Sequence, residues 1–197
     1  MCTTESETAM KNISTFRTAA ALAAVLGGAL LTGCGGSDGE AKEGGWPELD
    51  AQQVTLNHPE TYKLVDKRDL PKGVAAEADV KEGTVQSARI YVQTKFMQAG
   101  DVDMAALGAS TMYEFGGTPT DQKDIEVKGT DRAKLQSYTF ASSGKDNSPA
   151  RGTRMVGINV VGMDHEADPW VVRITAPQGK ISHADLDKIV KSIRVTG

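Results

Sequence analysis

Residues 153–176 read TRMVGINVVGMDHEADPWVVRITA, and this stretch decides the fold. Apolar side chains alternate at Val156, Ile158 and Val160, and alternate again from Trp170 onward, after a short acidic turn. Alternation with a period of two is typical of strands that bury one face. The stretch therefore predicts an antiparallel hairpin at the centre of a sheet.

A helix is predicted directly after this hairpin. Ser182-His183-Ala184-Asp185 resembles a capping box, with Asp in place of the usual Glu or Gln. Apolar residues then follow at helical spacing, at Leu186, Ile189, Val190 and Ile193. This pattern predicts a C-terminal amphipathic helix whose apolar stripe lies on the sheet.

The residues before the hairpin predict further strands and one helix. Strands are expected at 53–56, 62–65, 73–80 and 88–97. A turn is expected at Asn57-His58-Pro59, with a solvated or capping role for His58. A helix is expected from an N-cap at Asp101 to Gly116-Gly117, with one apolar face formed by Met104, Leu107, Thr111 and Phe115. Two more strands are expected at 125–128 and 132–142. This order predicts an α+β fold on a mostly antiparallel sheet.

Four of these segments together resemble the PsbP-like proteins. They are a short strand ending at His58-Pro59, the run 125–129, the hairpin 155–174 and the closing run 186–195. That family includes the extrinsic photosystem subunit, a nuclear Ran-binding factor and many bacterial lipoproteins. The resemblance covers about residues 50–197 and implies a PsbP-like α/β/α sandwich. It implies no activity, because fold and function separate readily.

Composition excludes several classes of protein. The chain has 197 residues, a formal net charge of −4 and two cysteines. An acidic balance argues against nucleic acid as a partner, because phosphate binding needs clustered Lys and Arg. Two cysteines rule out a disulfide scaffold.

The N-terminal residues resemble the leader of a bacterial lipoprotein. Lys11 and Arg17 precede an apolar run at 18–31, which is shorter than the about 20 residues of a membrane-spanning helix and suits a signal peptide. Met10 is an alternative start to Met1. The run ends in a lipobox-like sequence, Leu31-Thr32-Gly33-Cys34.

This resemblance implies cleavage between Gly33 and Cys34 and a covalent diacylglycerol on Cys34, with optional N-acylation by a chain such as palmitate. We therefore expect a signal peptide at 1–33, a lipidated Cys34 with a flexible Gly-rich tether at 34–48, and a single domain at 49–197. One acyl chain anchors a protein only marginally, whereas two chains hold it stably. A cell-membrane location on the extracytoplasmic side follows as an expectation.

Motifs for catalysis are absent from the sequence. It has no nucleophile elbow, P-loop, Cys-x-x-Cys pair or dinucleotide fingerprint. No catalytic residue and no cofactor beyond the Cys34 lipid is therefore expected. The acidic turn remains a weak metal candidate, because carboxylate and imidazole groups bind divalent cations, although Asp is common in turns for its geometry alone. Its candidate ligands are Asp164, His165, Glu166 and Asp168.

Three functional hypotheses follow from these observations. The favoured one is a membrane-anchored, non-enzymatic lipoprotein of the cell envelope that binds a protein partner or a small ligand. The second is a metal-dependent enzyme or metal binder that uses the acidic turn. The third is an envelope structural or assembly factor.

Overall fold

The computed structural model describes residues 45–111 and 117–196. Strands dominate this part of the chain, and two α-helices and one 3₁₀ helix complete it. In chain order the elements are β1 (Glu48–Asp50), β2 (Val54–Asn57), β3 (Lys63–Leu64), η1 (Lys67–Asp69), β4 (Ala76–Glu82), β5 (Val85–Thr94), α1 (Val102–Thr111), β6 (Thr118–Ile125), β7 (Ala133–Ala141), β8 (Arg154–Met163), β9 (Pro169–Pro177), α2 (His183–Ser192) and β10 (Arg194–Val195).

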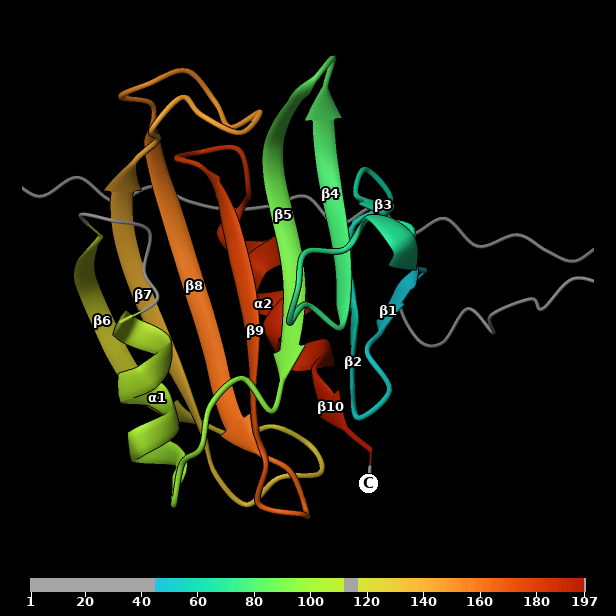
Figure 1. Cartoon of the computed structure of the whole chain (residues 1–197), viewed down its shortest axis with the longest axis vertical. Helices are drawn as coiled ribbons and strands as arrows, with labels where there is room; N and C mark the ends of the chain where they lie inside the picture. Colours follow the sequence, from blue (N-terminus) through green and yellow to red (C-terminus); the bar gives the residue numbers. More distant parts are fainter. Residues whose placement is uncertain (1–44, 112–116, 197) are drawn as a thin grey trace, which may run out of the picture. The chain divides into compact units, whose positions relative to one another are not determined.

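The strands form two sheets whose strand pairs are all antiparallel. The large sheet has the order β3-β4-β5-β9-β8-β7-β6, and the small one has the order β1-β2-β10 (Figure 1). The hairpin predicted from residues 153–176 is confirmed as β8 and β9, and β9 is the middle strand of the large sheet. The predicted α+β class, with a mostly antiparallel sheet, is confirmed as well.

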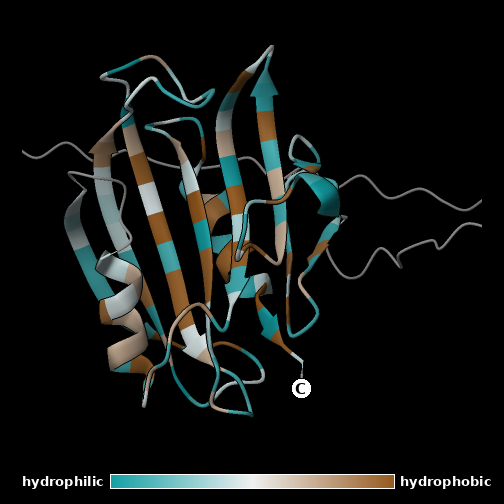
Figure 2. Ribbon diagram, viewed as in Figure 1, coloured by the Kyte–Doolittle hydropathy of each residue, from teal (hydrophilic) through white to brown (hydrophobic). Residues whose placement is uncertain are grey.

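The large sheet is covered on both faces. Val172 and Val160 belong to the main core together with Ile189 of α2, whereas their neighbours Val171 and Val161 pack with the alanines of α1. Adjacent residues of a strand point to opposite faces, so α1 and α2 lie on opposite sides, as Figure 1 shows. Figure 2 shows the alternating hydropathy along β4, β5 and β8 that this layering requires.

Two glycines of β8 make room for aromatic rings from the neighbouring strands. Gly157 lies opposite Tyr138 of β7, and Gly162 lies opposite Trp170 of β9. A Cβ atom at either glycine would overlap the ring of its partner. Aromatic residues at directly opposed positions cover the gap that a glycine leaves in a strand, and the two pairs therefore help to fix the register of β8.

The C-terminal helix begins and packs as its sequence predicts. The Ser182 hydroxyl accepts a hydrogen bond from the Asp185 amide at 3.0 Å and donates one to the Asp185 carboxylate at 2.7 Å. Ile189 and Ile193 are fully buried against the large sheet, and Leu186 and Val190 pack beside them. The N-cap at Ser182 and the apolar stripe are therefore both confirmed.

Helix α1 begins as predicted but buries a different face. The Asp101 carboxylate accepts from the Met104 amide at 2.8 Å, which confirms the N-cap. The prediction that Met104 and Leu107 face the core is wrong, because they are 51% and 61% exposed. The buried positions are Val102, Ala105, Ala106 and Ala109, whose short side chains let the helix backbone approach β7, β8 and β9. Thr111 is exposed as well, and the fourth predicted position, Phe115, lies outside the described residues.

The strand predicted at 125–128 is displaced in the structure. Strand β6 runs from Thr118 to Ile125 and pairs with β7, whereas residues 126–128 form only an isolated bridge between Lys128 and Arg194. Pro119 lies inside β6. An edge strand tolerates proline because one side of its backbone needs no ladder hydrogen bonds.

His58 is buried rather than solvated, which corrects the sequence expectation. Its side chain is 1% exposed, and its Nδ1–H donates to the Pro59 carbonyl at 3.0 Å. The ring lies 6.3 Å from that of Tyr62, centroid to centroid, and Nε2 has no hydrogen-bond partner among the described residues. Burial without a partner penalises the charged ring and lowers the pKa of His58.

We expect this histidine to make the domain less stable in mild acid. The folded-state pKa lies below the ordinary value of 6.5, so the unfolded chain binds more protons as the pH falls below 6.5. The stability contributed by the neutral ring is complete above that pH and is lost toward the lowered pKa. In urea denaturation at a series of pH values, His58→Gln should flatten this loss, while His165→Gln at an exposed position should not. Equal acid sensitivity in His58→Gln and the wild type would contradict the assignment.

Candidate functional site

A row of polar side chains crosses the face of the large sheet that carries α1. The strand registers place Gln136 of β7 beside Asn159 of β8, Asn159 beside Arg173 of β9, and Arg173 beside Tyr91 of β5. Gln136, Asn159 and Arg173 are all buried, and Arg173 is only 1% exposed. Burial of polar groups is costly unless hydrogen bonds satisfy them.

Arg173 is the centre of this polar row. Its Nη1 donates to Asn159 Oδ1 at 3.1 Å, its Nε donates to Gln93 Oε1 at 3.3 Å, and its Nη2 donates to the Ala109 carbonyl at 3.2 Å. No carboxylate of the described residues lies within salt-bridge distance of it. Among the residues that the structure describes, the acceptors of the guanidinium are all neutral.

The same row fixes α1 to the sheet. Ala109 lies near the C-terminal end of α1 as the structure describes it, and a carbonyl oxygen carries partial negative charge. Arg173 binds there, and Gln136 Nε2 donates to the Ala106 carbonyl at 3.0 Å and to Gln122 Oε1 at 3.0 Å. The Ala109 carbonyl thus supplies part of the negative charge that a buried cation needs.

A second polar cluster lies on the same face, on β4 and β5. The side-chain amide of Gln86 donates through Nε2 to Glu77 Oε1 at 2.9 Å and to Asp79 Oδ2 at 3.0 Å, and both carboxylates are almost fully buried. Arg89 Nη2 lies 3.4 Å from Glu77 Oε2, and Lys81 Nζ lies 3.2 Å from Asp79 Oδ2. Burial raises the pKa of Glu77 above its ordinary value, and Arg89 and Gln86 oppose that shift.

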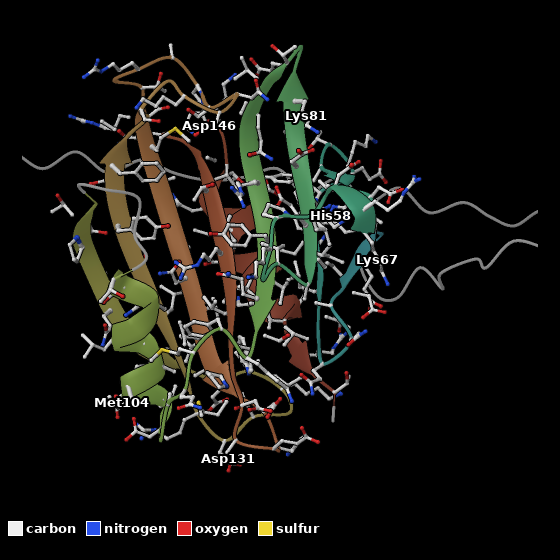
Figure 3. All side chains as sticks on the ribbon, in the orientation of Figure 1. His58, Lys67, Lys81, Met104, Asp131 and Asp146 are labelled. Atoms are coloured by element: carbon white, nitrogen blue, oxygen red, sulfur yellow. The ribbon has the colours of Figure 1, made fainter. Side chains whose placement is uncertain are left out.

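A cavity of about 340 Å³ lies next to this cluster, and we name it the Arg89 cavity. The 142–153 loop forms one wall of the cavity. The backbone N–H of Gln86 donates to the Asn147 carbonyl at 2.7 Å and so holds the loop to β5. Figure 3 labels Asp146 in this loop, at the end of the sheet that also carries Lys81. Its lining includes the side chains of Arg89, Phe140, Lys145, Ser148, Met155 and Thr175.

A second cavity, of about 430 Å³, lies on the opposite face beside the start of α2. Its lining is mainly apolar, with Ile158, Ile174, Ile181 and Leu186, and it includes the hydroxyl of Ser137. None of its lining residues carries a formal charge apart from a histidine at the first position of α2. This second cavity therefore offers apolar surface to a ligand, but no Lys, Arg, Asp or Glu side chain in its lining that could pair with a charged group.

The structure gives the residues of the acidic turn other partners. Asp164 Oδ1 accepts from the amides of Glu166 and Asp168 at 2.9 and 2.8 Å, and so closes the turn. Lys95 Nζ pairs with Asp168 at 2.7 Å and with Glu166 at 3.4 Å, while His165 is exposed. Within residues 45–111 and 117–196, no group of three His, Cys, Asp or Glu side chains is arranged to hold a metal ion.

The predicted lipidation site lies outside the described residues. This applies to the whole lipobox, Leu31, Thr32, Gly33 and Cys34, and to most of the tether. Across the part of the chain that the structure does describe, no helix is both long and apolar enough to cross a bilayer.

Sequence reasoning missed Arg89 and Arg173 as site residues. The signal for Arg173 was present, because a charged residue interrupts the apolar run Trp170-Val171-Val172 to Ile174 in the strand expected at the sheet centre. Arg89 gave no such signal, because it follows the ordinary polar alternation of its strand. Arg89 lines a cavity only because a loop more than 50 residues later in the chain forms the other wall.

Comparisons with known proteins support the fold. No protein-family model matches the sequence, and no curated protein matches it either. Among solved structures, the chain is similar to the cyanobacterial PsbP protein CyanoP from Synechocystis sp. PCC 6803, with a TM-score of 0.50 and 10% identity over 83% of this chain and 98% of that one. A protein from Bacteroides thetaiotaomicron VPI-5482 is also similar, with a TM-score of 0.47 and 8% identity over 75% of this chain.

The alignment covers 46% of the Bacteroides chain, so the present chain spans less than half of that protein's length. Identities of this size show the fold and not the function. Together with the antiparallel sheet and its two helices, the likeness to CyanoP leads to one conclusion: the fold of this chain is PsbP-like.

Proposed function

We propose that the chain is a lipid-anchored lipoprotein on the extracytoplasmic side of the cell membrane, and that it binds a protein partner or a small ligand without catalysing a reaction. The observation that carries the proposal is the order of the first residues: positive charge at Lys11 and Arg17, the apolar run 18–31, then Leu31-Thr32-Gly33-Cys34. Each part alone is common, but this order is the one that lipid transfer to a cysteine requires.

The beginning of the folded domain suits such an anchor. The chain joins the domain at Trp46, and Lys188 Nζ of α2 lies 3.8 Å from the centroid of the Trp46 ring. The sequence between Cys34 and this contact is rich in glycine, which is the composition expected of the tether at 34–48.

A binding role fits the described side chains better than a catalytic one. The buried His58 has a carbonyl as its hydrogen-bond partner, and the Ser142 hydroxyl donates to the Pro149 carbonyl at 2.6 Å. Nucleophilic catalysis needs a base within hydrogen-bond reach of a nucleophile. Neither side chain is arranged in that way, whereas the Arg89 cavity is large enough for a small molecule.

Metabolic labelling with an alkyne fatty acid tests the anchor. We expect the label on the wild type and on Cys2→Ala, and none on Cys34→Ala, because the chain has only these two cysteines. Cys2→Ala is the matched control for loss of a thiol. Label that persists on Cys34→Ala, or a wild type without label, would refute the anchor.

A further inference from the structure

The second cavity, beside the start of α2, lies where the cover of the large sheet ends. On this face Val172 and Ile174 of β9 are at most 2% exposed, in the main core with Ile189 of α2. Strands β6, β7 and β8 extend beyond α2 (Figure 1), and there Val156 of β8 and Ser137 of β7 are only half-buried. The face that carries the core thus continues into a cavity of about 430 Å³ that solvent reaches.

Two cross-strand rows form the floor of this cavity. The strand registers place Ser137 of β7 opposite Ile158 of β8, and Ile158 opposite Ile174 of β9. The next row, two positions along each strand, consists of Thr139, Val156 and Ala176. Residues at directly opposed positions lie on one face of a sheet. Each row therefore begins with a hydroxyl group on β7 and continues with hydrocarbon on β8 and β9.

The hydroxyl groups on the β7 side are available to a ligand. Ser137 and Thr139 are half-buried, and neither hydroxyl takes part in a hydrogen bond within the part of the chain that the structure describes. The exposed Thr120 of β6 adds a third hydroxyl to the lining. A hydroxyl group both donates and accepts, so it can bind a hydroxyl or a carbonyl group of a ligand. Ile181 and Leu186, at the start of α2, complete the apolar side.

The charge of the lining selects against ions. No Lys, Arg, Asp or Glu side chain lines the cavity, and His183 of the lining is exposed to solvent. A charged group that entered would lose hydration without gaining an opposite charge. Small-molecule sites typically combine an apolar lining with a few polar groups that fix orientation. The lining therefore matches a molecule that is uncharged and has one polar end.

We propose that the second cavity binds a small uncharged amphiphile, a molecule with a hydrocarbon body and a hydroxyl or carbonyl group. The hydrocarbon lies against Ile158, Ile181 and Leu186, and the polar group exchanges hydrogen bonds with Ser137 or Thr139. This inference rests on the binding role proposed above and names its ligand class. It does not depend on the lipid at Cys34.

Methyl NMR tests this site on the full-length chain in lipid nanodiscs, without detergent, because a detergent is itself an amphiphile. The probes are 1-hexanol, hexanoate and hexylammonium, which share one hydrocarbon body and differ in charge. Ile158 and Ile181 report on the cavity, and Val171, which packs with α1 on the opposite face, is the reference. We expect saturable shifts at the two isoleucines with 1-hexanol, binding of both ions weaker by about tenfold or more, and no shift at Val171.

Three results of this titration would overturn the proposal. The first is no saturable shift at Ile158 or Ile181 with 1-hexanol. The second is equal or tighter binding of either ion. The third is a 1-hexanol shift at Val171 as large as those at the two isoleucines.

Two variants at Thr139 locate the binding, with Thr111, exposed on α1, as the matched control position. Thr139→Trp places a large side chain over the floor and should weaken 1-hexanol binding about tenfold or more, whereas Thr111→Trp should bind like the wild type. Thr139→Lys adds a cation beside the hydrocarbon floor and should reverse the preference, so that hexanoate binds more tightly than 1-hexanol. A gain of hexanoate binding cannot come from unfolding.

The outcomes separate this inference from the anchor. Undiminished 1-hexanol binding in folded Thr139→Trp, or a Thr139→Lys chain that still prefers 1-hexanol to hexanoate, would refute the amphiphile site and leave the Cys34 label unaffected. A chain that carries no acyl label is titrated in buffer in the same way. If it binds 1-hexanol as expected, only the anchor is refuted.

Discussion

Arg173→Met should lower the free energy of unfolding by about 3 kcal/mol or more. Methionine fills a similar volume but donates no hydrogen bond, so Asn159, Gln93 and the Ala109 carbonyl each lose a charged donor. Each such loss costs about 1–3 kcal/mol where the acceptor stays buried. Methionine also avoids the desolvation of a buried cation, and this gain offsets part of the loss. Three lost hydrogen bonds and a detached α1 end outweigh it.

Urea denaturation followed by circular dichroism measures this change. The matched control is Arg154→Met, at an exposed position of β8 outside the polar row. It should change the free energy of unfolding by less than about 0.5 kcal/mol. If Arg173→Met were as stable as Arg154→Met, the polar row would not be what holds α1 to the sheet.

Trp170→Ala should destabilise the domain by about 3–5 kcal/mol, the usual cost of removing a large aromatic side chain from a core. Trp170 is 1% exposed on the central strand, and its ring covers Gly162 on β8. Alanine would leave a cavity and uncover the glycine at the same time. The variant removes one of the two tryptophans of the chain and so changes its intrinsic fluorescence. Unfolding in urea is therefore again followed by circular dichroism.

Trp170→Phe is the informative control for that variant. Its ring still covers Gly162, and it removes the Nε1–H of Trp170, which is buried and has no hydrogen-bond partner among the described residues. We therefore expect a loss well below that of Trp170→Ala. Similar losses in the two variants would show that the fit of the indole, rather than coverage of the glycine, determines stability here.

The elements predicted correctly are those with strong local patterns. Alternation at Val156, Ile158 and Val160 identified β8, and the spacing of Leu186 and Ile189 identified α2. In each element large apolar side chains line the face toward the main core, although β8 is buried on its other face too. The hydrogen-bonded caps at Ser182 and Asp101 were likewise visible, since capping depends on residues only three positions apart.

The errors arose where burial does not follow side-chain size. Met104 and Leu107 are the largest apolar residues of α1 and yet are exposed, because the polar row under the helix requires close backbone approach and only small side chains such as Ala105 permit it. Strand β6 is almost wholly exposed and polar. Its pairing with β7 is made by backbone groups, which leave no hydropathy pattern in the sequence.

The neighbours that the site residues have across the strands could not be predicted for a related reason. Gln136, Asn159 and Arg173 come from three strands and meet only through cross-strand register, and the Arg89 cavity needs the 142–153 loop to fold over β5. Local periodicity gives the face on which a residue lies but not its neighbour on the next strand. The lipobox is the opposite case, because its meaning depends on consecutive residues alone.

Intact mass and tandem mass spectrometry of the protein purified from its native membrane test the central claim most directly. The account predicts that the first residue is Cys34 and that its sulfur carries a diacylglyceryl thioether. A chain that retains residues 1–33, or one that begins at Cys34 with a free thiol, would contradict it.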